Sequence, residues 1–335
     1  MTKRPEPIRV QRIDRPLPEI RAWLRQRYPR AGIRGVGIGY RRRGVHGRLT
    51  DQAVIKVVLR DKRDDVPKSQ RIPRWLRIET TFLGKTVGVR LPVDIEQATE
   101  AEATRYQLES AGHVSTVSAY ARWREDGADR VGVVTAGHGL WTTPGGHSRR
   151  RVVKVLTEQS CDRPIDGRVR CASHLADHGV DAALVEIDAA ELGVCARRIW
   201  GDVRVLDDGE LFDALSASAD DDDFVGAVFR HPTVDGADLK SVAFFDEFTV
   251  SVAGWGLVTL RNVVETQGIR AVFEPGTSGA GVVTDDGERA LGIHAICLDP
   301  NVWMRGMATS FATARAWLSE AMGTPVELFW DDEVG

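Results

Sequence analysis

The sequence is poor in residues and patterns that would mark several classes of protein. It has four cysteines in 335 residues, and none of them forms a CxxC pair of the zinc-ligand type. So few cysteines argue against a disulfide-rich secreted fold, and we interpret them as reduced thiols. A Cys161–Cys171 bridge is the less favoured alternative, and Cys297 is interpreted as a core residue.

Membrane and nucleic-acid signals are also missing. No apolar run reaches the ~18 residues that a membrane-spanning helix needs. The basic N-terminus is followed by no apolar stretch of the secretory kind. The net charge of −3 provides no basic field for a nucleic acid. We therefore expect a cytoplasmic protein with no membrane or nucleic-acid partner.

Residues 1–95 are expected to form a small α+β domain. Apolar residues at helical spacing predict a helix from Leu17 to Tyr28. Two strands and one hairpin are predicted after it, at residues 33–40, 52–60 and 80–91. The glycines of the first strand do not fit GxGxxG and no strand precedes them, so a dinucleotide-binding loop is not expected.

The rest of the chain has a different composition and a different pattern of predicted secondary structure. Residues 96–111 are polar and free of Gly and Pro, which predicts a helical linker between separate cores. From residue 112 to 325, short β-rich runs alternate with turn signals and predict a barrel or sandwich. Thr309 or Ser310 is expected to cap one closing helix, and residues 326–335 form an acidic tail.

Three short stretches carry residues that could perform chemistry. Glycines crowd around Ser278 in FEPGTSGAGVV, residues 273–283, where a tight turn is the plain alternative. His138 follows a β-run in VVTAGHGL, and Asp181 begins an apolar strand in GVDAALVEID. An acid at the start of a buried strand is costly unless it is paired. The order His, Asp, Ser along the chain is that of the chymotrypsin type of triad.

These motifs resemble those of trypsin-like serine peptidases. The Thr-Ala-Gly-His run ending at His138 resembles their Thr-Ala-Ala-His motif, and Val-Asp-Ala-Ala-Leu around Asp181 resembles Asp-Ile-Ala-Leu. Gly-Thr-Ser-Gly-Ala around Ser278 resembles Gly-Asp-Ser-Gly-Gly. The resemblance covers roughly residues 112–322 and implies a mainly β, chymotrypsin-like double β-barrel. The segment before it resembles the leader domain of bacterial and plant narrow-leaf-type peptidases.

The resemblance implies a serine endopeptidase that needs no cofactor and no metal. Ser278 would be the nucleophile, His138 the general base and Asp181 the residue that orients the imidazole. The N–H groups of Gly276 and Ser278 would form the oxyanion hole. Thr277 replaces the aspartate with which zymogen-type relatives pair a newly cut N-terminus, so activation by that route is not expected.

The resemblance also implies a substrate pocket lined by Val272, Phe273 and His294. Trypsin-like pockets for basic side chains carry an aspartate six residues before the serine, and this chain has Val272 there. A preference for lysine or arginine is therefore not expected. A small or apolar side chain is favoured, and an acidic side chain recognised by His294 is the alternative.

Other functions remain as alternatives. His174 and His178 have the i, i+4 spacing of a helical metal site, but no glutamate follows the zincin pattern. Asp177 and Asp188 compete with Asp181 for the role of the triad acid. The barrel could also be a catalytically silent or self-restrained scaffold in protein assembly or regulation. In that case the N-terminal domain would be the assembly module, through which a homo-oligomer could form.

Overall fold

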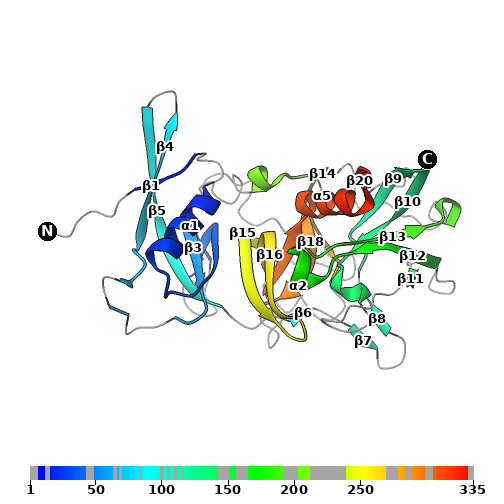
Figure 1. Cartoon of the computed structure of the whole chain (residues 1–335), viewed down its shortest axis with the longest axis horizontal. Coiled ribbons are helices and arrows are strands. Elements are labelled where there is room, and N and C mark those ends of the chain that lie inside the picture. The colour runs from blue at the N-terminus through cyan, green and yellow to red at the C-terminus, as the bar shows by residue number, and fades with distance from the viewer. Residues whose placement is uncertain are drawn as a thin grey trace.

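The computed structural model describes a mainly β protein with few helices, as the sequence predicted (Figure 1). Its strands belong to a 12-stranded sheet, a six-stranded sheet and a two-stranded ladder. The residues that the structure describes are 7–11, 16–42, 49–62, 66–67, 70–82, 85–98, 102–103, 106–108, 112–114, 116–141, 151–155, 165–191, 203–211, 239–268, 278–283, 288–298 and 305–330.

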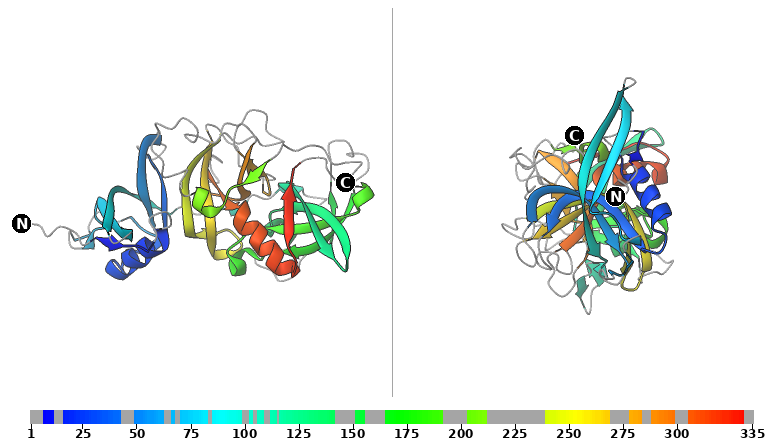
Figure 2. Two further views of the ribbon diagram at one scale, coloured as in Figure 1. Left: turned by 90° about the horizontal axis from the view of Figure 1, so that it is seen from above. Right: turned by 90° about the vertical axis from the view of Figure 1, so that its left-hand side faces the viewer.

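The N-terminal part combines one helix with one end of the large sheet. Helix α1 spans Leu17–Arg27, in agreement with the predicted helix, and buries Leu17, Ile20 and Leu24. Its strands are β1 (Ile8–Arg9), β2 (Ile33–Arg42), β3 (Leu49–Leu59), β4 (Trp75–Phe82) and β5 (Lys85–Gln97). The β4–β5 hairpin was also predicted, and Figure 2 shows it projecting from the body of the protein.

The glycines of β2 allow a close sheet contact with the C-terminal half. Strand β15 (Leu239–Val252) pairs antiparallel with β2, so that both halves of the chain share the 12-stranded sheet. A Cβ atom at Gly37 would lie 2.5 Å from the carbonyl oxygen of Phe244, and one at Gly39 would lie 2.2 Å from that of Val242. The glycine pattern of this strand therefore serves sheet packing.

The remaining strands complete the two sheets. The large sheet also contains β6 (Glu102–Ala103), β14 (Arg204–Val205), β16 (Gly256–Gly268), β17 (Gly281–Val283), β18 (Arg289–Cys297) and β19 (Arg305–Ser310). The six-stranded sheet has the order β11 (Val152–Val155), β12 (Ile165–Ala172), β13 (Ala183–Ile187), β10 (Ala128–Thr135), β9 (Ala119–Glu125), β20 (Val326–Phe329). The short ladder pairs β7 (Tyr106–Leu108) with β8 (Gly112–Val114).

Helix α5 (Phe311–Met322) joins the two sheets. The side chain of Ser310 accepts a hydrogen bond from the N–H of Thr313, which caps the helix as predicted. The helix ends at Gly323, whose φ of 67° is in the left-handed region that favours glycine. Its buried residues share an apolar cluster with Trp123 of β9 and Ile293 of β18, one from each sheet.

The expected double barrel is not confirmed, because the pairings among the described strands form open paths and close no barrel. The structure differs from the sequence-based expectations in two places. Part of the segment 96–111, predicted as a helical linker, instead lies in strands β5, β6 and β7, where distant β18 pairs with β6 and β8 pairs with β7. Residues 326–329 of the predicted acidic tail form β20, where Val326 is buried. The domain limits at 95 and 112 stay predictions.

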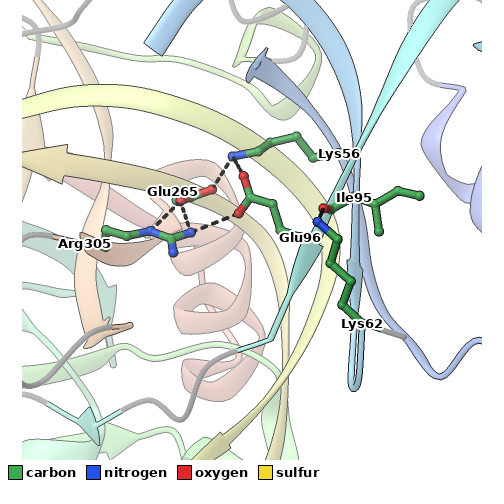
Figure 3. Close-up of polar contacts among 6 residues, drawn as sticks. All are labelled: Lys56, Lys62, Ile95, Glu96, Glu265 and Arg305. Carbon is green, nitrogen blue, oxygen red and sulfur yellow. Dashed lines mark hydrogen bonds and ion pairs between the residues drawn. The ribbon is translucent and has the colours of Figure 1, made fainter. Parts of the chain in front are cut away.

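Buried and partly buried ion pairs connect the N-terminal strands to the C-terminal ones (Figure 3). Nζ of Lys56 on β3 lies 3.0 Å from Glu265 on β16 and 3.1 Å from Glu96 on β5. Arg305 on β19 lies 2.6 Å from Glu265 and 3.2 Å from Glu96. Lys56 and Glu265 are buried, whereas Glu96 and Arg305 stay partly exposed, so the Lys56–Glu265 pair is the one withdrawn from water.

Among the described helices, none has the length and apolar character required to cross a membrane.

Candidate active site

His138 is held at the point where a buried strand ends. Strand β10 ends at Thr135, and His138 begins the short 3-10 helix η2 (His138–Leu140). A Cβ atom on Gly137 would lie 2.4 Å from Oγ of Ser173 and 2.7 Å from the carbonyl oxygen of Ala182. The glycine is therefore required by the close approach of the chain that leads to Asp181.

Asp181 contacts His138 through both carboxylate oxygens. Its Oδ2 lies 2.6 Å from Nδ1 of His138, and its Oδ1 accepts the backbone N–H of His138 at 2.8 Å. Both side chains are wholly buried. Two hydrogen bonds to one residue fix the plane of the carboxylate, so that the imidazole is held in one orientation.

Thr309 supports this pair from the other sheet. Its Oγ1 accepts the backbone N–H of Asp181 at 3.3 Å. Thr309 belongs to β19, where it pairs with Ile293 of β18. The sequence had suggested Thr309 only as a helix cap. No local pattern could reveal its actual contact, because the two residues are 128 positions apart.

Ser278 lies on a loop that is held from two sides. Gly279, with a φ of 86°, donates its N–H to the carbonyl oxygen of His294 at 2.9 Å. The N–H of His294 donates to the carbonyl oxygen of Ala280 at 2.8 Å. On the other side, Thr116 donates its N–H to the carbonyl oxygen of Ser278 at 2.7 Å. Ser278 is buried, which is the setting of a held loop rather than of a solvated turn.

Two chains of contacts bring the serine loop toward the His138–Asp181 pair. Thr116, which binds the serine carbonyl, also accepts the hydroxyl of Thr135 at 2.7 Å, three residues before His138. On the opposite side, Ile293 pairs with Gly281 of β17 and with Thr309 of β19. The three predicted residues therefore converge from both sheets on one region.

The structure does not join the serine to the histidine by a hydrogen bond. Nε2 of His138 is buried and has no hydrogen-bond partner among the described residues. In the triad that the sequence predicts, the nucleophile would give its proton to that nitrogen. The structure therefore contains the His138–Asp181 half of the arrangement, whereas no hydrogen bond joins Ser278 to His138. Such contacts are often long before substrate binds.

The other candidate residues have different surroundings. Asp177 lies 2.8 Å from Nδ1 of His174, and Asp188 caps the N–H of Ala190 at 2.9 Å. Of the three aspartates that we considered, Asp181 is the one that contacts His138. His174 precedes the four-residue helix α2 (Leu175–His178) and His178 ends it, and the N–H of His174 binds the ring of His178. No group of three His, Cys, Asp or Glu side chains in the described part of the chain could hold a metal ion.

Several predicted residues lie outside the described part of the chain. These are Gly276 of the expected oxyanion hole, Val272 and Phe273 of the expected pocket, and Cys161. His294 is described and buried, and its main chain pairs with the serine loop. Cys171 and Cys297 are buried.

Comparison with known proteins adds no relative: no model of a protein family matches this sequence, and neither does a curated protein.

Proposed function

We propose that this protein is a serine endopeptidase that uses Ser278, His138 and Asp181. The observation that carries the proposal is the buried His138–Asp181 pair, together with the buried Nε2 that lacks a partner among the described residues. If Nδ1 donates its proton to Asp181, Nε2 is the acceptor of the imidazole. A buried acceptor beside a held serine loop is the arrangement that general-base activation of a hydroxyl requires.

In the proposed reaction, Oγ of Ser278 attacks the carbonyl carbon of a peptide bond. His138 takes the hydroxyl proton on Nε2 and then donates it to the leaving amine. Asp181 stabilises the imidazolium that forms between these two steps. The N–H groups of Ser278 and Gly276 would bind the oxyanion, and losing one such donor typically costs ~3 kcal/mol of barrier lowering. Water then hydrolyses the acyl-enzyme.

We further propose that the two open sheets correspond to a chymotrypsin-like double barrel. His138 follows β10 and Asp181 precedes β13, both strands of the six-stranded sheet, whereas Ser278 precedes β17 in the large sheet. A triad shared between two β units in this manner supports the proposed class. A cytoplasmic location, and a homo-oligomer formed through the N-terminal part, stay predictions.

A self-restrained peptidase is the second candidate, and one observation favours it. Strand β6 pairs with β18 two and three residues beyond His294, next to the serine loop. The chain itself therefore contacts the region that a peptide substrate would have to reach.

Active-site labelling with a fluorophosphonate tests the proposed function. Wild type should be labelled, and Ser278→Ala should lose both labelling and peptide hydrolysis while its unfolding transition is kept. Ser251→Ala is the matched control, because Ser251 is an exposed serine on β15. Equal labelling of wild type and Ser278→Ala would exclude Ser278 as the nucleophile. A wild-type protein that is never labelled would favour the silent scaffold.

A further inference from the structure

One edge of β18 carries both the serine loop and a segment from the N-terminal half. Ile293 pairs with Thr309 of β19 and, on the opposite edge, with Gly281 of β17. Ile296 likewise pairs with Met307 of β19 and, on the opposite edge, with Ala103 of β6. Because a strand has two edges and β19 occupies one of them, β17 and β6 lie along the same edge of β18.

The serine loop lies between these two partners. Gly279 and Ala280 bind both main-chain groups of His294, which stands between Ile293 and Ile296 on β18. Moving along the edge, the ladder partners are thus β17, the serine loop and then β6. The two residues of β6, Glu102 and Ala103, continue the line of β17 past the nucleophile.

That line is where an extended peptide would bind. A peptide whose carbonyl group approaches Ser278 must run beside the serine loop, and a free strand edge binds such a backbone by adding it to the sheet. The main-chain groups next along the edge belong to Ile296 and Cys297. In this structure, Ala103 and Glu102 pair with them in antiparallel register.

The same segment also contacts the nucleophile from its other end. After β6 the chain forms the β7–β8 ladder, and Thr116 then donates its N–H to the carbonyl oxygen of Ser278 at 2.7 Å. Residues 102 and 116 therefore contact the site at two points. A connection between two parts of a protein does not need to pair with the strand edge beside a nucleophile.

We propose that β6 is an internal inhibitory strand, which occupies the backbone-binding edge of β18 and keeps peptide substrates out. This rests on the proposed peptidase function, since it is the site of that reaction which β6 would block. The competing ligand is an extended peptide backbone that pairs with Ile296 and Cys297. The strand has two residues, so a substrate has little pairing to displace.

The size of the effect follows from the ladder. A net backbone hydrogen bond changes an equilibrium constant by roughly fivefold. Loss of the β6 pairing should therefore lower KM for an extended peptide by about tenfold or more, and leave kcat unchanged, because the reacting groups are untouched. A small fluorophosphonate needs no strand edge, so its labelling rate should change by less than about twofold.

The test uses the full chain with Glu102→Pro and Ala103→Pro together, because proline cannot donate to a ladder. The matched control is Arg204→Pro with Val205→Pro. These residues form β14, an equally short partner of β18 that pairs at Arg289 and Ala290, away from the serine loop. We expect a lower KM in the β6 variant and an unchanged KM in the β14 variant. If the proline variant does not fold, Glu102→Gly with Ala103→Gly weakens the same ladder.

A binding measurement separates this proposal from the proposed function. In a Ser278→Ala background, the labelled peptide TEAEATRY, which copies residues 99–106, should bind the β6 variant at least about tenfold more tightly than the unaltered chain. Equal peptide binding and equal KM would overturn the inhibitory strand, although labelling of wild type would still support a peptidase. Tighter peptide binding without any labelling would support the strand-binding edge and overturn the peptidase.

Discussion

Nζ of Lys56 lies 3.0 Å from Oε2 of Glu265, although the two residues are 209 positions apart and belong to different halves of the chain. Their strands do not pair with each other: β2 and β15 lie between them in the strand order. The ion pair therefore spans the join between the halves. It makes the contact between the N-terminal strands and the C-terminal sheet sensitive to a single buried charge.

We predict that Lys56→Met destabilises the protein by about 3 kcal/mol. Removing one partner of a buried pair leaves the other charge without compensation. Breaking a buried ion pair typically costs about 3–5 kcal/mol, and we expect the low end of this range because Arg305 still contacts Glu265. Urea unfolding measures the change. Lys62→Met is the matched control: Lys62 is exposed and binds the carbonyl oxygen of Ile95, so its loss should cost less than about 0.5 kcal/mol. Equal effects of the two variants would contradict the prediction.

The sequence could predict the parts of the fold that depend on local patterns. The spacing of Leu17, Ile20 and Leu24 follows one helix face, and Ser310 and Gly323 act at the two ends of α5 as expected. The pairing of His138 with Asp181 also followed from short motifs. An acid before a buried strand requires a partner, and the histidine was the candidate in the matching motif.

The remainder depends on contacts between distant segments. Nothing near residues 33–40 indicates that their glycines face β15, because the close approach is set by Phe244 and Val242. The polar segment 96–111 predicts a helix by composition, yet β6 takes its conformation from β18. The contact of Thr309 with Asp181 likewise joins distant segments of the chain. Such pairings are non-local, and propensity alone does not determine them.

Asp246 should make stability depend on pH. It lies on β15 and is 2.7 Å from Arg21 of α1; Glu247 contacts Arg21 and Arg25 nearby. Burial, opposed by Arg21, raises the pKa of Asp246 from 3.8 to about 6. Its Oδ1 has no hydrogen-bond partner among the described residues. A raised pKa means that this group adds stability below pH 3.8, which is lost as the pH rises through about 6.

The free energy of unfolding of Asp246→Asn should therefore increase, relative to that of wild type, as the pH rises. Asparagine resembles the protonated acid, so the difference in the free energy of unfolding should shift by about 2 kcal/mol in favour of the variant between pH 4.5 and 7.5. Subtracting the wild-type free energy of unfolding at each pH removes the contributions of the other titrating groups. Unfolding curves at five or six pH values measure this, and a flat difference would show that Asp246 does not titrate with a raised pKa.

Gly137→Ala should displace His138 and remove activity. The added methyl group would meet Oγ of Ser173 at 2.4 Å, so the chain that carries His138 has to move. A misplacement of about 1 Å in a catalytic group can cost about 100-fold in rate. Gly127→Asn is the control, because Gly127 has a φ of 79° in the β9–β10 turn and no atom within 4 Å of its added Cβ. Peptide hydrolysis should be lost in the first variant and kept in the second.

Thr309→Val and Asp181→Asn should distinguish a residue that positions Asp181 from one that acts on the imidazole itself. The hydroxyl of Thr309 accepts the N–H of Asp181 and valine cannot, so its loss should cost about 1–3 kcal/mol of stability and leave much of the turnover. Asp181 orients the imidazole itself, and its replacement by asparagine should lower kcat by about 10⁴. Comparable losses of kcat in both variants, at full folding, would place Thr309 in the catalytic machinery.

Cleavage should show no preference for lysine or arginine. Val272 stands six residues before Ser278, where a pocket for basic side chains needs a counter-charge, and burying an unpaired cation is costly. A small or apolar side chain before the cleaved bond is expected instead. The main chain of His294 pairs with the serine loop, which keeps the residue beside the site.

Profiling a peptide library with wild type and His294→Ala measures both expectations. Enrichment of basic residues would contradict the first. Cleavage after glutamate that disappears in the variant would show that the imidazole receives an acidic side chain. The same apolar profile in wild type and variant would instead remove the histidine side chain from recognition. Its main chain would then contribute by holding Gly279 and Ala280, a role that alanine can keep because no side-chain atom takes part.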